Sequence, residues 1–255
     1  MTDLPRTPSF RLEGRRAVVT GAGRGIGLAA AAALAEAGAH VTLVARTQQE
    51  IQSGAEAIVA QGGKAEWAIL DVTAPEEVSH FFSTRPAFHI LVNNAGTNRP
   101  KPMFDVSVED FDAVFNLNVR AAFFVAQAAA RRMITDQIQG SLIHMGSQMG
   151  HVGGINRSLY CGSKWALEGM NKSFALDLAQ YGIRSNTLAP TFVETPMTTP
   201  FFADQEFLNS VLEKIKLGRL AQVTDLMGPI VFLASDASSL ITGTSVIVDG
   251  GWTAE

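Results

Sequence analysis

The chain reads Val18-Val19-Thr20-Gly21-Ala22-Gly23-Arg24-Gly25-Ile26-Gly27 near its start, and this stretch decides the fold. It leads from a short β-branched run into an alanine-rich run, residues 26–37, which has the composition of a helix. Glycines at such a turn let the backbone approach a pyrophosphate, and the helix N-terminus supplies partial positive charge. A plain turn is the alternative, but the position between strand and helix favours a phosphate-binding loop.

Short apolar runs alternate with longer helical runs along the whole chain, which is typical of a parallel sheet covered on both faces. The predicted strands are 17–20, 41–44, 65–70, 90–92, 142–145, 185–188 and 245–248. The predicted helices are 26–37, 48–61, 75–83, 108–134, 158–181 and 224–235. No linker-like change of composition divides the chain. We therefore expect one Rossmann-like, doubly wound α/β domain over residues 12–255, after a short extension, residues 1–11.

Composition favours a cytoplasmic protein that binds a small molecule. The 255 residues are 47% hydrophobic and 17% charged, and the net charge of −4 provides no broad basic surface for nucleic acid. The first ten residues lack the apolar core of a signal peptide, and the apolar stretch 28–39 is too short to cross a membrane. The single cysteine, Cys161, excludes an internal disulfide; it is either a reactive thiol or a small packing residue. No metal site is predicted.

Two long helical runs, 108–134 and 158–181, carry apolar residues on more than one face. A helix of this kind is covered on all sides, either by its own fold or by a second subunit. We expect a second subunit and a homotetramer. The stretch 191–217 is apolar but irregular in pattern and follows a strand end, so we expect a substrate lid there. A helical subdomain that only packs on the core is the alternative.

Tyr160 and Lys164 are four positions apart in a predicted helix, so both side chains lie on one face. Free tyrosine ionises near pH 10, and a nearby lysine cation lowers that pKa, so the pair is suited to proton transfer. Ser147 follows a predicted strand, at the sheet edge where ligands bind in open α/β folds. Taken alone, the Tyr160–Lys164 pair could lie on a helix surface, and Ser147 could be an ordinary turn residue. Together they indicate a catalytic set.

With these residues in register, the sequence resembles the short-chain dehydrogenase/reductase family. The loop has that family's spacing, Thr20-Gly21-x-x-x-Gly25-x-Gly27, and the likeness covers the chain from Leu12 to Trp252. Its further motifs are Asp71-Val72, Asn93-Asn94-Ala95-Gly96, Asn116-Leu117-Asn118-Val119 and Val248-Asp249-Gly250-Gly251. One departure is Pro190-Thr191, where the family usually has Pro-Gly.

The resemblance implies a role for each catalytic residue. The Ser147 hydroxyl would bind the substrate oxygen, Tyr160 would transfer the proton, Lys164 would also hold the nicotinamide ribose, and Asn118 would hold a water in a proton relay. The residues expected to bind the cofactor are Gly21, Arg24, Gly25, Ile26, Gly27, Arg46, Asp71, Val72, Asn94, Ala95, Gly96, Tyr160, Lys164, Val193 and Thr195.

NADP is the expected cofactor, with NAD as the alternative. Proteins that bind NAD in this kind of fold place an acidic residue after the second strand, where it contacts the ribose hydroxyls. Here that strand ends in Ala45-Arg46, so the acid is missing and a guanidinium follows. Arg24 in the phosphate loop could reach the same 2′-phosphate. If both arginines are solvated surface residues, either cofactor would serve.

The substrate residues expected from their positions are Gln148, Met149, His151, Asn156, Arg157 and Phe192, with Asn98 and Arg99 at the rim. This mixed polar set suits a hydroxylated or anionic carbonyl compound. His151 and Arg157 are either carboxylate ligands or surface residues. Several stretches resemble gluconate 5-dehydrogenase-like members that act on sugars or polyols.

Two other functions stay open. One is 3-oxoacyl-carrier-protein reductase, with Arg120, Arg131 and Arg132 as a docking patch. The other is a non-catalytic nucleotide sensor, a class that tends to lose the Tyr or the Lys.

Overall fold

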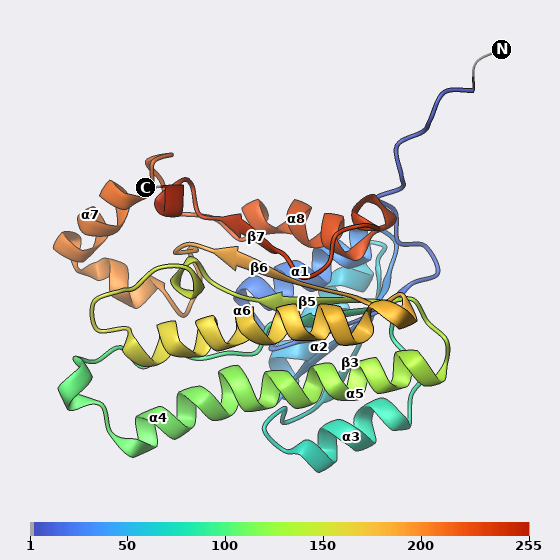
Figure 1. Ribbon diagram of the computed structural model, residues 1–255, viewed down its shortest axis with the longest axis horizontal. Helices are drawn as coiled ribbons and strands as arrows, with labels where there is room; N and C mark the ends of the chain where they lie inside the picture. Colours follow the sequence, from blue (N-terminus) through green and yellow to red (C-terminus); the bar gives the residue numbers. More distant parts are fainter. Residues whose placement is uncertain (1–2, 255) are drawn as a thin grey trace.

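All seven predicted strands form one parallel sheet in the computed structural model, which describes residues 3–254 (Figure 1). The strands lie in the order β3-β2-β1-β4-β5-β6-β7, so the order reverses between β1 and β4. Their bounds are β1 Arg16–Thr20, β2 His40–Ala45, β3 Lys64–Ile69, β4 Ile90–Asn93, β5 Ser141–Met145, β6 Arg184–Pro190 and β7 Ser245–Val248. Each agrees with its prediction to within two residues. The central strands β4 and β5 are buried throughout, because helices cover both faces of the sheet.

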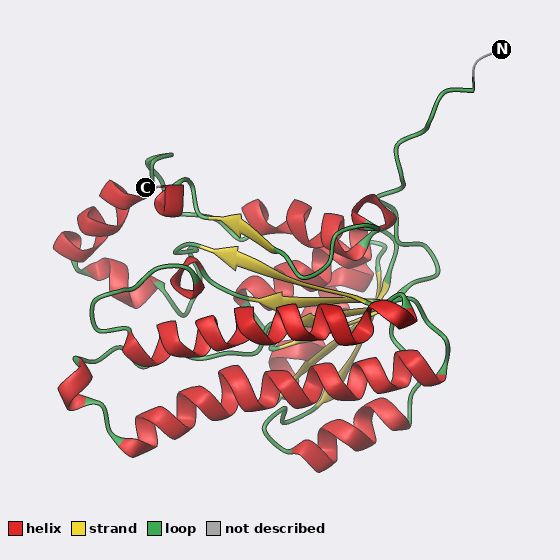
Figure 2. Cartoon of the chain, in the orientation of Figure 1, coloured by secondary structure: helices red, strands yellow, loops and turns green. Residues whose placement is uncertain are grey.

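Helices pack on the two faces of the sheet and form two hydrophobic clusters (Figure 2). One cluster joins the sheet to α1, α2 and α8, and the other joins it to α3, α5 and α6. The α-helices are α1 Gly25–Glu36, α2 Gln48–Ala60, α3 Pro75–Ser83, α4 Val108–Phe115, α5 Ala122–Thr135, α6 Ser158–Leu178, α7 Gln205–Lys214 and α8 Thr224–Ala234. The 3₁₀ turns are η1 Met103–Asp105, η3 Gln148–Gly150, η4 Ala179–Tyr181, η5 Thr199–Ala203, η6 Asp236–Ser238 and η7 Trp252–Ala254.

The predicted helix 108–134 consists of three pieces. A capping box between Ser107 and Asp110 starts α4, and a π-helical segment, η2 Asn116–Ala121, separates α4 from α5. By length and composition alone this stretch could cross a membrane. In this structure it lies over the sheet, where α5 buries Val125, Met133 and four alanines.

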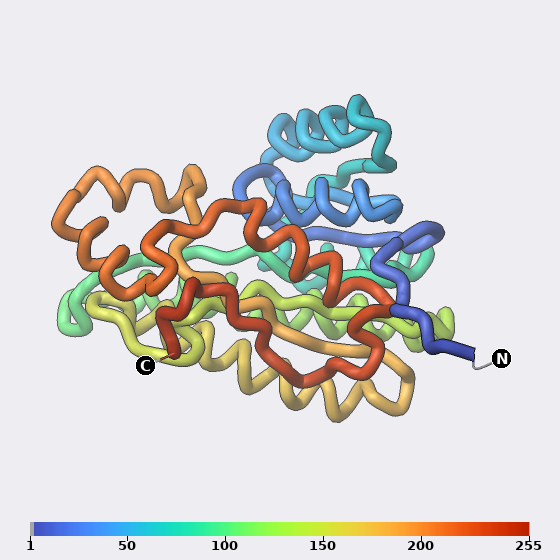
Figure 3. Tube along the Cα trace, turned by 90° about the horizontal axis from the view of Figure 1, so that it is seen from above, coloured from blue at the N-terminus to red at the C-terminus, as the bar shows by residue number. Residues whose placement is uncertain are grey.

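The stretch 191–217 is more regular than its sequence pattern suggested. It contains the 3₁₀ turn η5 and the helix α7, which starts where the Asp204 carboxylate accepts hydrogen bonds from the amides of Glu206 (3.0 Å) and Phe207 (3.1 Å). Figure 3 shows α7 projecting from the end of the molecule opposite the N-terminus.

At the N-terminus, residues 3–11 are exposed and burial begins at Leu12. Residues 1 and 2 of that extension lie outside the described residues.

Candidate active site

A cleft of about 410 Å³ lies at the carboxyl ends of the strands, where the strand order reverses. Open α/β sheets bind ligands at this position, because the loops after neighbouring strands diverge there. Every residue predicted to hold the cofactor lines this cleft. So do Ser147 and four of the predicted substrate residues, namely Gln148, Met149, Arg157 and Phe192. The tertiary structure therefore brings the dispersed motifs to one place.

The glycine-rich loop forms the end of the cleft next to α1. Gly21 and Gly25 have φ angles of +62° and +57°, a region that favours glycine. No side chain caps α1, so its first backbone amides are left for another acceptor. Asn94 ties β4 to this loop, since its side-chain amide donates to the carbonyls of Thr20 (2.9 Å) and Gly21 (3.2 Å). This arrangement suits a pyrophosphate.

Charged side chains surround the next part of the cleft, beside the end of β2. Arg46 is exposed, and its charge acts on Asp71 across the gap. Burial alone would raise the pKa of Asp71, but hydrogen bonds from the Thr73 hydroxyl (2.7 Å) and amide (2.9 Å), together with Arg46, lower it. Arg24 forms a 3.4 Å ion pair with Glu50. Glu50 lines the cleft and was not predicted, because its position in α2 carries no motif.

Ser147, Tyr160 and Lys164 lie at the other end of the cleft. Ser147 follows β5, where its hydroxyl donates to Gln148 Oε1 (2.9 Å) and accepts from the Met149 amide (3.1 Å). Lys164 is buried, and its Nζ donates to the Met145 carbonyl (2.6 Å) while lying 5.5 Å from the centre of the Tyr160 ring. The three side chains thus come from one strand end and one helix face.

Burial dominates the ionisation of this set. It raises the pKa of the Tyr160 hydroxyl, although the Ser147 hydrogen bond and the Arg157 charge oppose this. It lowers the pKa of Lys164 to about 8, with Glu168 acting in the opposite direction. The expected lowering of the Tyr160 pKa by Lys164 is therefore not found in this structure. The physical reason is that burial has the largest effect on the Tyr160 pKa, while the Lys164 ammonium donates to the Met145 carbonyl.

Asn118 does not line the cleft, unlike the other three predicted catalytic residues. Its side chain is buried in the π-helical segment η2, where Oδ1 accepts from the Thr97 amide (2.8 Å). Its Nδ2 donates to the Thr97 carbonyl (2.9 Å) and to the Ser163 hydroxyl (3.0 Å). Asn118 thus holds the loop after β4 against α6. A Cβ added at Gly96 in that loop would lie 3.3 Å from Asn118 Oδ1, so a larger residue there would press on Asn118.

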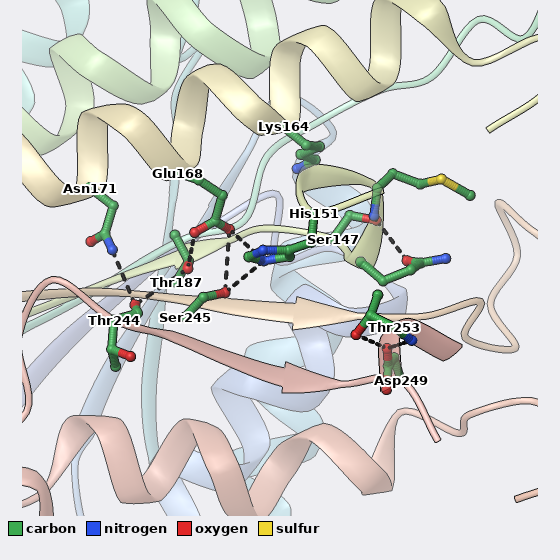
Figure 4. Close-up of polar contacts among 12 residues, drawn as sticks. Ser147, His151, Lys164, Glu168, Asn171, Thr187, Thr244, Ser245, Asp249 and Thr253 are labelled. Atoms are coloured by element: carbon green, nitrogen blue, oxygen red, sulfur yellow. Dashed lines mark hydrogen bonds and ion pairs between the residues drawn. The ribbon is translucent and has the colours of Figure 1, made fainter. Parts of the chain in front are cut away.

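His151 also lies outside the cleft, in contrast to its predicted substrate role. Figure 4 shows its ring directed toward Glu168 and Ser245, where Nε2 lies 3.0 Å from the Ser245 hydroxyl and 3.6 Å from Glu168 Oε1. Glu168 is buried and accepts from the Thr187 hydroxyl (2.7 Å). Burial raises the pKa of the Glu168 carboxyl despite these partners. Glu168 was not predicted, although its place one helical turn after Lys164 is a usable signal.

Of the two predicted rim residues, Asn98 lines the cleft and Arg99 does not. Asn156, which was predicted to contact the substrate, does not line it either. Arg99 is engaged with Asp110 at 3.1 Å, and the Asn156 carbonyl accepts from the Lys101 amide (3.0 Å). Within residues 3–254, no three His, Cys, Asp or Glu side chains gather in a way that could hold a metal ion.

A phosphate-binding loop and a Tyr-Lys-Ser set that open onto one cleft define a nicotinamide-dependent oxidoreductase. A family model described as enoyl-(acyl carrier protein) reductase matches residues 21–253. L-Xylulose reductase from Bos taurus is 38% identical over 245 residues, which cover 96% of this chain and 99% of that protein. Gluconate 5-dehydrogenase from Gluconobacter oxydans is 38% identical over 248 residues. The match covers 96% of this chain and 96% of that protein.

A solved structure of a related enzyme is similar over nearly the whole chain. The crystal structure of a gluconate 5-dehydrogenase from Burkholderia cenocepacia, in complex with NADP and tartrate, matches with a TM-score of 0.92 at 37% identity. The match covers 96% of this chain and 98% of that one. This chain belongs to the short-chain dehydrogenase/reductase family.

Proposed function

We propose that this oxidoreductase uses NADP to interconvert a secondary alcohol and a ketone on a sugar acid or polyol. The observation that carries the proposal is the convergence of Ser147, Tyr160 and Lys164 on the cleft that the glycine-rich loop enters. The related proteins named above act on sugars or sugar acids, and one was crystallised with NADP and tartrate. A test is to follow nicotinamide absorbance with a panel of ketoses, sugar acids and polyols.

The chemistry assigns separate tasks to the three side chains. When bound, the nicotinamide supplies the acceptor or donor of the hydride. In the oxidation direction the substrate carbon gives up its hydride, and Tyr160 takes the hydroxyl proton, so the product is a ketone. Ser147 holds the reacting oxygen, and Lys164 holds the ribose beside the tyrosine. In reduction the same proton moves from Tyr160 to the carbonyl oxygen.

The preference for NADP is tested by three variants. The wild-type ratio of kcat/KM should favour NADP by tenfold or more, about 1.4 kcal/mol. Ala45→Asp should shift the ratio toward NAD by like-charge repulsion. Arg46→Ala should weaken NADP alone, with the loss shrinking at high salt. Arg131→Ala, at an exposed arginine of α5, is the matched control. A tenfold wild-type preference for NAD would overturn this assignment.

The proposed homotetramer rests on apolar side chains that the single chain leaves exposed. Phe104, Trp165 and Leu176 are 85%, 54% and 81% exposed, on η1 and α6. Light scattering should give about four times the chain mass of 27.2 kDa, and Trp165→Glu should lower it. A mass of one chain at all dilutions would contradict the proposal.

We further propose a cytoplasmic enzyme without a nucleic-acid or membrane partner, in which residues 191–217 serve as the substrate lid. The lid proposal draws support from Phe192, Met197 and Phe201, which line the cleft from this segment. Carrier-protein docking is disfavoured, since Arg132 pairs with Asp136 (3.1 Å) and the Arg120 guanidinium lies over the Phe124 ring. A non-catalytic sensor is disfavoured by the presence of both Tyr160 and Lys164.

A further inference from the structure

Unpartnered buried polar atoms are concentrated in the cleft. Across residues 3–254, four buried side-chain nitrogen or oxygen atoms have no hydrogen-bond partner. Three of them, Asn98 Oδ1, Arg157 Nη1 and Thr191 Oγ1, belong to residues that line the cleft. The fourth belongs to Arg132, which pairs with Asp136 through another nitrogen. Because folded proteins satisfy nearly all such atoms, this clustering indicates that a polar ligand completes the site.

Arg157 is the most unusual of the three. Its side chain is only 7% exposed, yet no hydrogen bond or ion pair of its guanidinium exists within the described chain. Leaving a buried cation without an anion or acceptor is costly. Burial accordingly lowers the pKa of Arg157, and the groups whose charges oppose this are the Tyr160 phenol and the Cys161 thiol rather than a carboxylate.

The surroundings of Arg157 place it at the substrate end of the cleft. The guanidinium lies 5.3 Å from the Phe201 ring centre and 6.0 Å from that of Phe192, both from the proposed lid. Arg157 is also the N-cap residue of the long helix α6, and no side chain caps that helix. The helix N-terminus adds positive potential at the same place. The glycine-rich loop, by contrast, lies at the start of α1, where it would hold the cofactor pyrophosphate.

We propose that Arg157 binds a carboxylate of the substrate, so that the enzyme acts on hydroxy acids in preference to neutral polyols. This inference rests on the proposed oxidoreductase function and narrows its substrate class. A single guanidinium matches one carboxylate, to which it can form paired charge-assisted bonds. The unpartnered Asn98 Oδ1 then accepts a hydrogen bond from a substrate hydroxyl. The catalytic Tyr160, one turn along α6, then meets a hydroxyl group on another carbon of the same substrate.

The test compares substrates that differ only in the acid group. D-Gluconate and D-glucitol share the same hydroxylated skeleton, with a carboxylate in one and a hydroxymethyl group in the other. Wild type should reduce NADP with D-gluconate at a higher kcat/KM. Arg157→Met should lower that value by roughly 10- to 100-fold, mainly through KM, as the loss of a charged hydrogen bond predicts. The same variant should lower the value for D-glucitol by a much smaller factor, since only the acid loses a charged partner, and its affinity for NADPH should stay within about twofold of wild type.

Two further variants control the measurement. Arg157→Lys keeps the charge but loses the forked geometry and should fall between wild type and Arg157→Met. Arg11→Met, at an exposed arginine paired with Glu13, should behave as wild type. Thermal denaturation should show that Arg157→Met is at least as stable as wild type, because the substitution removes a buried unpaired charge. A loss of stability would show that the guanidinium serves the fold instead.

Binding provides a readout that does not depend on turnover. L-Tartrate should bind the enzyme–NADP complex in calorimetry, and Arg157→Met should abolish the binding, whereas erythritol should not bind either protein. Equal effects of Arg157→Met on acid and neutral ligands would overturn the inference. An effect confined to sugar phosphates would also overturn it, in favour of a phosphate ligand. If no compound reduces NADP while tartrate binding still depends on Arg157, the proposed reaction fails and the anion site stands.

Discussion

Tyr160→Phe lowers kcat by roughly 10²- to 10⁴-fold, the usual contribution of a positioned acid or base, and leaves NADPH binding intact. In the proposed mechanism only the hydroxyl moves the proton, whereas the ring packs in the cleft beside Lys164, whose Nζ lies 5.5 Å from the ring centre. Steady-state rates and a fluorescence titration with NADPH measure the two effects separately. The change removes one oxygen and leaves the packing volume nearly unchanged.

The chain contains its own control for this substitution. Tyr181, the other of the two tyrosines, is exposed at the end of η4, and Tyr181→Phe should be silent. Because burial raises the pKa of Tyr160, the oxidation rate of wild type should rise with pH as the phenol ionises. That rise should be missing in Tyr160→Phe. Wild-type turnover by Tyr160→Phe would remove the tyrosine from the mechanism.

Lys164→Met should abolish turnover and also weaken NADPH binding, since the ammonium is proposed to hold the ribose and to support Tyr160. The same substitution should stabilise the protein in the absence of cofactor. Burial lowers the pKa of Lys164 from 10.5 to about 8, so below pH 8 the folded state carries an unfavourable buried charge. At 1.36 kcal/mol per pKa unit, and allowing for the lost bond to the Met145 carbonyl, the gain is roughly 1–3 kcal/mol at pH 7.

The sign of the pH dependence follows from proton binding. Between pH 8 and 10.5 the unfolded chain binds more protons at Lys164 than the folded chain does, so wild-type stability gains from this residue as pH rises. The difference between Lys164→Met and wild type should therefore shrink across this window. Urea denaturation at pH 7 and pH 9.5 measures it, with Lys172→Met, at an exposed lysine of α6, as the control. A difference that is constant with pH would show that Lys164 is not desolvated, and unaltered NADPH affinity would show that it does not touch the ribose.

The order of elements and the location of the site could be predicted from sequence because their signals are local. The strand β1, the glycine-rich turn and α1 follow each other within one continuous stretch, and the period of the apolar residues distinguishes strand from helix. Tyr160 and Lys164 meet because one helical turn separates them. Once the strands are parallel, Ser147 must lie at the same edge as the glycine-rich loop, since all strands end there.

The environment of each side chain was decided by the tertiary structure. Asn118 and His151 carry the right chemistry for the cleft, but Thr97 holds the first and Glu168 with Ser245 holds the second outside it. These partners come from other elements, and no local pattern encodes them. The helix α7 was missed because Pro196 and Pro200 interrupt the apolar pattern before it.

Arg157 shows most clearly the difference between what the sequence predicts and what the tertiary structure decides. Its sequence position indicates only that it lies near Tyr160, with a substrate ligand and a solvated surface residue as equal alternatives. The fold removes it from water, places Phe192 and Phe201 against it and provides no acceptor. Sequence alone determined which residues meet at the carboxyl edge of the sheet, because backbone periodicity and strand direction are local properties. Burial, ionisation and the lack of a partner depend on contacts between distant segments, so only the tertiary structure decided them.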